Sequence, residues 1–259
     1  MESRNKLTNL ELALWDALIA DEAFGEELHN LVEIGSLIWQ RGWAEANAGN
    51  VSIRIADCLP KTIKVIKEVF NDCTRYAPDF GNYTWFLVSA TGSRYREFPR
   101  LGFLNFVLIG INQTNQTQII FPTDRKPTSE WVTHLAVHNK LLNSPDNNKV
   151  ILHTHPTDWI VLCNSLKYIE APEQTLSELF TYLPELGIYL PDGITRVPLT
   201  APGSAELAVL TLEALEKSKV ILWEKHGLFV TAESINRAFD YMEIVSKAAT
   251  VYLATRNKN

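Results

Sequence analysis

His153 and His155 end an apolar run that begins at Val150, and a single residue separates them. In an extended strand, residues i and i+2 point to the same side, so both imidazoles can reach one point in space. A third histidine, His226, follows a second apolar run at residues 220–223 and precedes Gly227. The three histidines predict a metal site with an open coordination position. Each histidine would also fit as an ordinary hydrogen-bonded residue at a strand end.

The ligand types favour zinc. Three neutral imidazoles leave a fourth position for water or substrate, which is the arrangement of catalytic rather than structural zinc. Thiolate ligands are scarce nearby, since Cys163 lies well past the histidine pair. We therefore expect one Zn²⁺ ion per subunit.

Three further segments carry groups that suit anions. Residues 42–50 form a turn of small residues that includes Asn47 and Asn50, and Thr91-Gly92-Ser93-Arg94 forms a second such turn. Turns of this kind can aim backbone N–H groups and amides at an anion, but both also fit as plain connections. The third segment is Thr128-Ser129-Glu130, whose hydroxyls can cap the following helix or seat a phosphate at its N-terminus.

Two other polar features each have two interpretations. Glu130 is either a surface carboxylate matched to the helix dipole or a positioned acid–base group. His134 and His138 have the i, i+4 spacing of a metal pair on a helix face, but without an HExxH context packing or hydrogen bonding is the better interpretation.

Composition narrows the class of protein. Of the 259 residues, 46% are apolar and 21% charged, which predicts a globular core. A net charge of −6 argues against a nucleic-acid partner. Three cysteines, Cys58, Cys73 and Cys163, contain no CxxC pair and indicate a reducing compartment. Without an evident signal peptide or membrane-length apolar run, we expect a cytoplasmic protein with no membrane partner.

Strand-like and helix-like segments alternate along the chain. We therefore predict an α/β (α+β-like) fold, a single domain over residues 1–259 with a central mixed, largely antiparallel sheet flanked by helices. Its core is expected at about 24–256, after an N-terminal helical extension at 1–22 with a capping box at Thr8. Residues 57–82 form an excursion. Predicted strands are 51–55, 83–90, 104–111 with 118–121 as a hairpin, 150–155, 185–190 and 220–223; predicted helices are 24–41, 131–142, 158–163, 173–182, 204–216 and 234–254.

Five motifs in fixed order, from Asn47-Ala48-Gly49-Asn50 through Thr91-Gly92-Ser93, residues 127–130 and His153-Thr154-His155 to Lys225-His226-Gly227, resemble the class II aldolase/adducin family over about residues 30–252. The resemblance implies zinc bound by the three histidines and Glu130 as the catalytic acid–base residue. It also implies a C4-symmetric homotetramer in which Glu185 is a second catalytic glutamate reaching the neighbouring subunit's site. The implied phosphate- and substrate-binding residues are Asn47, Gly49, Asn50, Thr91, Gly92, Thr128 and Ser129.

The implied reaction cleaves a phosphorylated ketose between C3 and C4. The excursion at 57–82 and the stretch from Glu185 to Gly193 are most similar to members that convert L-rhamnulose 1-phosphate to dihydroxyacetone phosphate and L-lactaldehyde in rhamnose catabolism. Zinc would stabilise the enediolate fragment, since no lysine in an apolar strand offers a Schiff base. Alternatives are cleavage of L-fuculose 1-phosphate, 4-epimerisation of a pentulose phosphate, dehydration of a methylthio-ribulose phosphate, or an adducin-like binding module without catalysis. Ala48 departs from the family pattern, because glycine is common at that position.

Overall fold

The computed structural model describes residues 9–55, 83–112, 114, 118–122, 124–142 and 144–256. Its contacts divide the chain into two compact units. The first unit comprises Met1–Ser36 and Ser52–Thr128, and the second comprises Leu37–Val51 and Ser129–Asn259. The predicted excursion and the predicted capping box at Thr8 lie outside the described residues. The expectation of a single domain over residues 1–259 stays a prediction.

The first unit contains an antiparallel run of strands. β2 (Tyr83–Ser89) pairs with β3 (Phe106–Asn112), which pairs with β4 (Gln118–Phe121) as the predicted hairpin. On its other edge, β2 pairs with β1 (Asn50–Arg54). Helix α1 (Asn9–Ile19), most of α2 (Glu22–Gln40) and the short segments η4 (Tyr95–Glu97), α4 (Phe98–Leu101) and η5 (Gly102–Asn105) belong to the same unit. Trp15 of α1 stacks on Phe103 with ring centroids 4.9 Å apart, so α1 is anchored to this unit.

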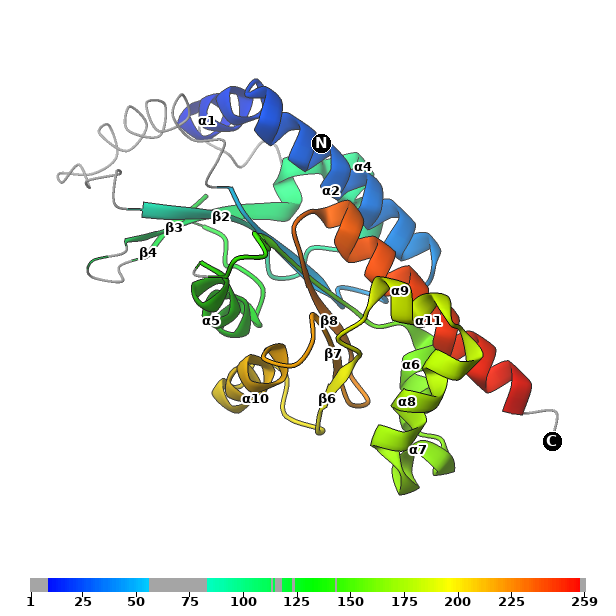
Figure 1. The fold of residues 1–259 in the computed structure, drawn as a ribbon. Coiled ribbons are helices and arrows are strands. Elements are labelled where there is room, and N and C mark those ends of the chain that lie inside the picture. The colour runs from blue at the N-terminus through cyan, green and yellow to red at the C-terminus, as the bar shows by residue number, and fades with distance from the viewer. Residues whose placement is uncertain are drawn as a thin grey trace. The chain divides into compact units, whose positions relative to one another are not determined.

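The second unit is built on strands in the order β5 (Val150–Thr154), β8 (Gly227–Ala232), β7 (Val220–Trp223) and β6 (Thr195–Val197). Figure 1 labels β8, β7 and β6 of this set. The β5–β8 and β8–β7 pairs are antiparallel, while β7 and β6 are parallel. The predicted α/β fold with a mixed, largely antiparallel sheet flanked by helices is therefore confirmed.

Helices cover both faces of these strands. α5 (Trp131–Leu141) and α10 (Ala205–Leu215) pack on the face that carries Ile151 and Phe229, and they share one apolar core with it. Alternate residues face the long helix α11 (Ile235–Arg256), where the Thr154 hydroxyl donates to the Met242 sulfur at 3.5 Å. α11 also contacts α6 (Thr157–Cys163), α8 (Pro172–Tyr182) and α9 (Glu185–Tyr189), and α7 (Leu166–Glu170) packs on α8. Because His153 is two residues from Ile151, it lies on the α5 face.

One prediction about this unit was wrong, and two strands, β6 and β8, were not predicted. The expected strand at 185–190 is the helix α9, because Leu186 and Leu190 are buried at i, i+4 spacing while Ile188 between them is 78% exposed. The strand β8 was not predicted, although its six residues are all buried. It forms the return strand of a hairpin with β7.

Among the described residues, no helix is both long enough and apolar enough to cross a bilayer.

Candidate metal centre

β5 presents His153 and His155 on one side, as their spacing predicts. His153 pairs in register with Phe229 of β8 and is fully buried. His155 follows the last strand residue, and its backbone N–H donates to the Trp43 carbonyl at 2.8 Å. Pro156 then serves as the N-cap of α6. The strand thus ends one residue before His155, and the turn into α6 fixes the position of this histidine.

His226 lies in the tight turn between β7 and β8. Trp223 pairs with Gly227 across this turn, and the His226 N–H donates to the Trp223 carbonyl at 3.0 Å. Lys225 takes a left-handed conformation with φ 59°, which is uncommon for a residue other than glycine. Antiparallel pairing of β8 with β5 then brings this turn next to the end of β5.

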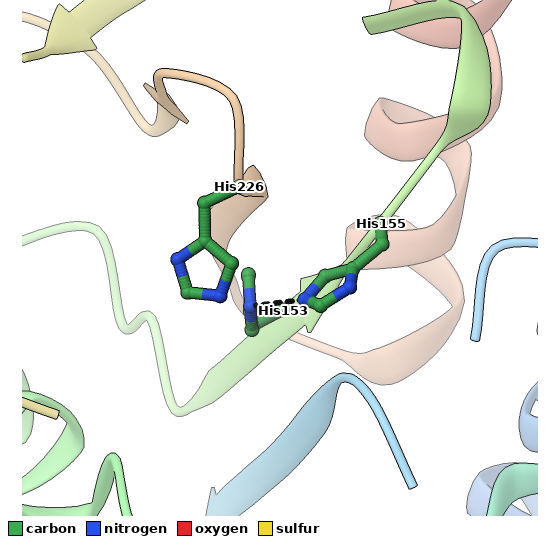
Figure 2. Close-up of side chains that lie close together, drawn as sticks. All are labelled: His153, His155 and His226. Carbon is green, nitrogen blue, oxygen red and sulfur yellow. Dashed lines mark hydrogen bonds between the residues drawn. The ribbon is translucent and has the colours of Figure 1, made fainter. Parts of the chain in front are cut away.

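The three imidazoles converge. One ligand nitrogen from each of His153, His155 and His226 lies within 4.8 Å of the others. Figure 2 shows the rings close together, with His153 from β5, His155 from the residue that follows β5, and His226 from the β7–β8 turn. Their ring centroids are 4.7 to 5.0 Å apart. Within the described part of the chain, this is the group of side chains arranged to hold a metal ion.

Hydrogen bonds at the far side of two rings specify their tautomers. His153 Nδ1 lies 2.8 Å from the Leu228 carbonyl oxygen, which can only accept, so Nδ1 carries the proton and Nε2 keeps its lone pair. His155 Nδ1 lies 3.0 Å from Glu45 Oε1. Partial burial alone would raise the pKa of Glu45, but hydrogen bonds to His155 and its own backbone bring that pKa below its ordinary value. The carboxylate is therefore ionised and accepts from Nδ1–H.

These tautomers leave a place that a cation fits. The two Nε2 atoms of His153 and His155 face each other at 3.1 Å. Two acceptor nitrogens at that distance repel unless a proton or a metal ion lies between them. Tetrahedral zinc with Zn–N distances of about 2.0–2.1 Å would place two ligand nitrogens about 3.3 Å apart. The residues present therefore fit a zinc ion.

Protonation does not compete with a metal for His153 and His226 at neutral pH. Burial lowers the pKa of His153 well below its ordinary value, and the nearby His155 and His226 lower it further. Burial and the neighbouring His155 lower the pKa of His226 to about 4. Both imidazoles are neutral, which is the form that binds a metal.

Glu130 faces the histidine cluster. Its Oε2 lies 3.7 Å from His153 Nε2 and its Oε1 lies 3.5 Å from His226 Nε2. The Asn50 amide nitrogen donates to Oε2 at 2.7 Å. Burial raises the pKa of Glu130, and the hydrogen bond from Asn50 partly offsets that rise. A buried carboxyl with a raised pKa beside a metal site is the arrangement of a proton-transfer group.

The predicted capping of α5 by Thr128 and Ser129 was wrong. The N-cap residue is Glu130, and its side chain makes no capping hydrogen bond to the helix. The Glu130 carboxylate turns instead toward Asn50 and the histidines. Thr128 donates its backbone N–H to the Ser89 carbonyl at 2.9 Å within the first unit.

The other phosphate candidates fall in both units. In the second unit, Asn47 and Ser129 are exposed and Gly49 has φ 75°. Asn50 is buried against Glu130, so it contacts the acid–base candidate directly. Ala48 needs no positive φ, because the left-handed residues of this turn are Gly42, Ala46 and Gly49.

In the first unit, Thr91 and Gly92 lie beside the segment that precedes Thr128. The Thr91 N–H donates to the Lys126 carbonyl at 2.8 Å, and its hydroxyl donates to the Pro127 carbonyl at 2.5 Å. Gly92 has φ 78°, and a Cβ added to it would meet no atom within 4 Å. The Thr91 hydroxyl proton is thus engaged in holding the turn.

The remaining sequence candidates lie elsewhere in the fold. Glu185 is exposed in the first turn of α9. It does not belong to the metal group found among the described residues. His134 and His138 are buried on α5, and neither belongs to the metal group. His134 packs edge-on against Phe229, and burial lowers its pKa to about 3. Packing is therefore the better interpretation of this pair.

Glu45 was not among the residues singled out from the sequence. It lies 110 residues before His155, in the exposed turn that starts after Trp43. The one available signal was its place two residues before Asn47, inside the turn already considered for anion binding. Nothing in that position indicates a histidine partner.

The chain is also similar to known proteins in sequence and in structure. The family described as Class II Aldolase and Adducin N-terminal domain matches residues 29–253. The chain is 30% identical over 237 residues to the rhamnulose-1-phosphate aldolase of Bacteroides thetaiotaomicron, covering 91% of this chain and 88% of that protein. A sugar-phosphate aldolase from Thermotoga maritima has a similar structure, with TM-score 0.72, 27% identity and coverage of 92% and 97%. An L-fuculose 1-phosphate aldolase shares the fold, with TM-score 0.61, 17% identity and coverage of 90% and 88%.

Proposed function

Because this chain belongs to the class II aldolase and adducin family, we propose that it is a zinc-dependent aldolase cleaving L-rhamnulose 1-phosphate to dihydroxyacetone phosphate and L-lactaldehyde. Family and relatives make it a carbon–carbon lyase of carbohydrate metabolism. The observation that carries the finer proposal is the convergence of His153, His155 and His226 opposite the buried Glu130. A role in rhamnose catabolism follows from the named relative at 30% identity.

The three histidines would hold the metal through Nε2 of His153 and of His155 and through one ring nitrogen of His226. When bound, zinc supplies Lewis-acid stabilisation of the negative charge that breaking the C3–C4 bond leaves on the dihydroxyacetone phosphate fragment. Cleavage between C3 and C4 needs such an electron sink. Three neutral ligands leave the full charge of the ion available for it.

Glu130 would move the proton. As the C3–C4 bond breaks, the C4 hydroxyl loses its proton to solvent and becomes the aldehyde. The Glu130 carboxyl group then delivers a proton to C3 of the dihydroxyacetone phosphate fragment, and in the synthetic direction its carboxylate removes that proton. Burial raises the pKa of Glu130 and so favours the protonated form, while the hydrogen bond from Asn50 favours the carboxylate. Asn50 also limits the rotation of the carboxylate, which keeps its oxygens directed at the histidine cluster.

The phosphate end of the substrate would be bound by backbone N–H groups and polar side chains of the small-residue turns. We assign this role to Asn47, Gly49, Asn50, Thr91, Gly92, Thr128 and Ser129. Binding the unreactive end orients the reacting carbons and so lowers the entropic part of the barrier.

The assembly and compartment are part of the same proposal. We infer a C4 homotetramer in the cytoplasm, with Glu185 contributing to the site of a neighbouring subunit. The exposure of Glu185 at the start of α9 fits a residue that acts outside its own subunit.

The proposal is tested on one purified sample by measuring metal content and aldol cleavage together. L-Rhamnulose 1-phosphate and L-fuculose 1-phosphate are supplied with and without a chelator. We expect about one zinc per chain, chelator-sensitive release of dihydroxyacetone phosphate and preference for L-rhamnulose 1-phosphate. Preference for the fuculose substrate would refute the sugar assignment. Zinc without cleavage of either sugar would favour an epimerase or dehydratase, and neither metal nor cleavage would favour a binding module.

A further inference from the structure

Glu45 is not one of the proposed metal ligands, but its carboxylate hydrogen-bonds to the ligand His155. Its Oε1 lies 3.0 Å from His155 Nδ1, on the side of the ring away from the nitrogen that faces His153. The contact is within the second unit, because Glu45 belongs to Leu37–Val51. Both residues of this contact therefore belong to the same unit.

The turn that carries Glu45 is attached to the end of β5 at a second point. The His155 backbone N–H donates to the Trp43 carbonyl at 2.8 Å, two residues before Glu45. Trp43 is buried and packs on Phe239 of α11 with ring centroids 5.9 Å apart. Downstream, the Ala48 N–H donates to the Glu45 carbonyl at 2.8 Å, and Ala46 between them takes a left-handed φ of 49°. The backbone around Glu45 is thus held against His155 independently of the carboxylate.

The other two ligands are oriented differently. His153 donates its Nδ1–H to a backbone carbonyl, that of Leu228, which no side-chain substitution removes. The buried Nδ1 of His226 has no hydrogen-bond partner within the described residues. His155 is the ligand whose partner is an ionisable side chain. A carboxylate that accepts from the distal N–H of a ligand imidazole sets the tautomer, fixes the ring plane and makes the ligand nitrogen more basic.

From these contacts we propose that Glu45 is a positioning residue, which orients His155 and strengthens its bond to the metal without touching substrate. This inference rests on the function proposed above, since it concerns the same metal site. The side chain of Glu45 is 67% exposed, so water screens its charge and little of the folding stability depends on it. Its effect is expected on metal affinity, where loss of such partners typically costs about 10- to 100-fold.

The test compares zinc affinity among Glu45→Ala, Glu45→Gln and the wild-type protein, by competition with a chromogenic chelator. Glu213→Gln is the matched control, because Glu213 is exposed on α10 and does not belong to the group of side chains that could hold the metal. Thermal unfolding of each metal-free protein is measured in parallel. The absorption spectrum of the Co²⁺-substituted proteins reports the ligand field without any catalytic turnover.

We expect Glu45→Ala to weaken zinc binding about 10- to 100-fold and to change the Co²⁺ spectrum. Glu45→Gln keeps an acceptor without the charge, so its affinity should lie between the alanine variant and wild type. Glu213→Gln should match wild type, and all four metal-free proteins should unfold at the same temperature.

Zinc affinity of Glu45→Ala within twofold of wild type would overturn the inference. Weaker zinc binding by Glu45→Ala together with a lower unfolding temperature of the metal-free variant would also overturn it. The role of Glu45 would then be structural. Either result, with wild-type zinc binding intact, leaves the proposed aldolase function standing. Failure of the wild-type protein itself to bind zinc would instead refute the proposed function.

Discussion

Gly227 has no room for a side chain beside the proposed metal ligands. It directly follows His226 and lies opposite the end of β5. A Cβ added there would stand 2.3 Å from the Thr154 carbonyl oxygen, 3.0 Å from His155 Cδ2 and 3.1 Å from His153 Cε1. Its φ is outside the left-handed region, so the cost of Gly227→Ala is one of space alone.

The size of the effect follows from these distances. A carbon and a carbonyl oxygen rest about 3.3 Å apart, so β5 and β8 would have to separate by about 1 Å at this point. Overpacking of this kind typically costs about 1–3 kcal/mol. For a protein of this size, the melting temperature would fall by about 2–12 °C. Metal–ligand distances in a well-formed site lie within about 0.2 Å of their usual values. We therefore expect the free energy of zinc binding to weaken by more than the free energy of unfolding.

The assay measures the melting temperature of metal-free Gly227→Ala and its zinc affinity by chelator competition. Gly187→Ala is the matched control, because a Cβ on Gly187 in α9 meets only Phe180 Cδ1, at 3.8 Å, which is an ordinary contact. That variant should be unchanged or slightly stabilised through helix propensity. Native zinc affinity and native melting temperature in Gly227→Ala would refute the reasoning, since the strands would then have room that the structure denies them.

Three further predictions concern the ligands, the acid–base group and the scaffold. Glu130→Gln should retain zinc yet lose about 10²- to 10⁴-fold in turnover, measured by release of dihydroxyacetone phosphate; near-normal turnover would remove Glu130 from proton transfer. His226→Ala should lose both zinc and cleavage activity because two imidazoles remain, and full zinc occupancy by elemental analysis would contradict the three-histidine site. Ser204→Ala removes the side-chain oxygen that accepts from the Leu207 N–H at the start of α10, so it should cost about 1 kcal/mol of stability. Its zinc affinity should stay native, and a loss there would show that α10 and the metal centre are coupled.

Local patterns predicted much of the site. The spacing of His153 and His155 is sufficient to place both rings on one side of β5, because side chains alternate along a strand. The position of Glu130 at the start of α5 was also evident from the sequence. Those predictions depend on neighbouring residues only, and the structure agrees with them.

Local patterns failed where tertiary packing decides the secondary structure. Residues 185–190 contain enough apolar side chains for a strand, yet they form α9 because Leu186 and Leu190 bury one helical face. Thr128 and Ser129 suit a cap by residue type, but α5 begins after them. In both cases the competing interpretations differ little in intrinsic propensity, and the surrounding packing selects one.

The sequence by itself determined the ligand types, their directions along β5 and the class of chemistry that they favour. Only the tertiary structure decided which distant residues meet them. Antiparallel pairing of β8 with β5 brings His226 to the end of the first histidine strand. Folding also joins Asn50 to Glu130 across 80 residues and Glu45 to His155 across 110. The physical reason is that backbone periodicity fixes where a side chain points within its own element, whereas its partner depends on strand register and on how turns are anchored.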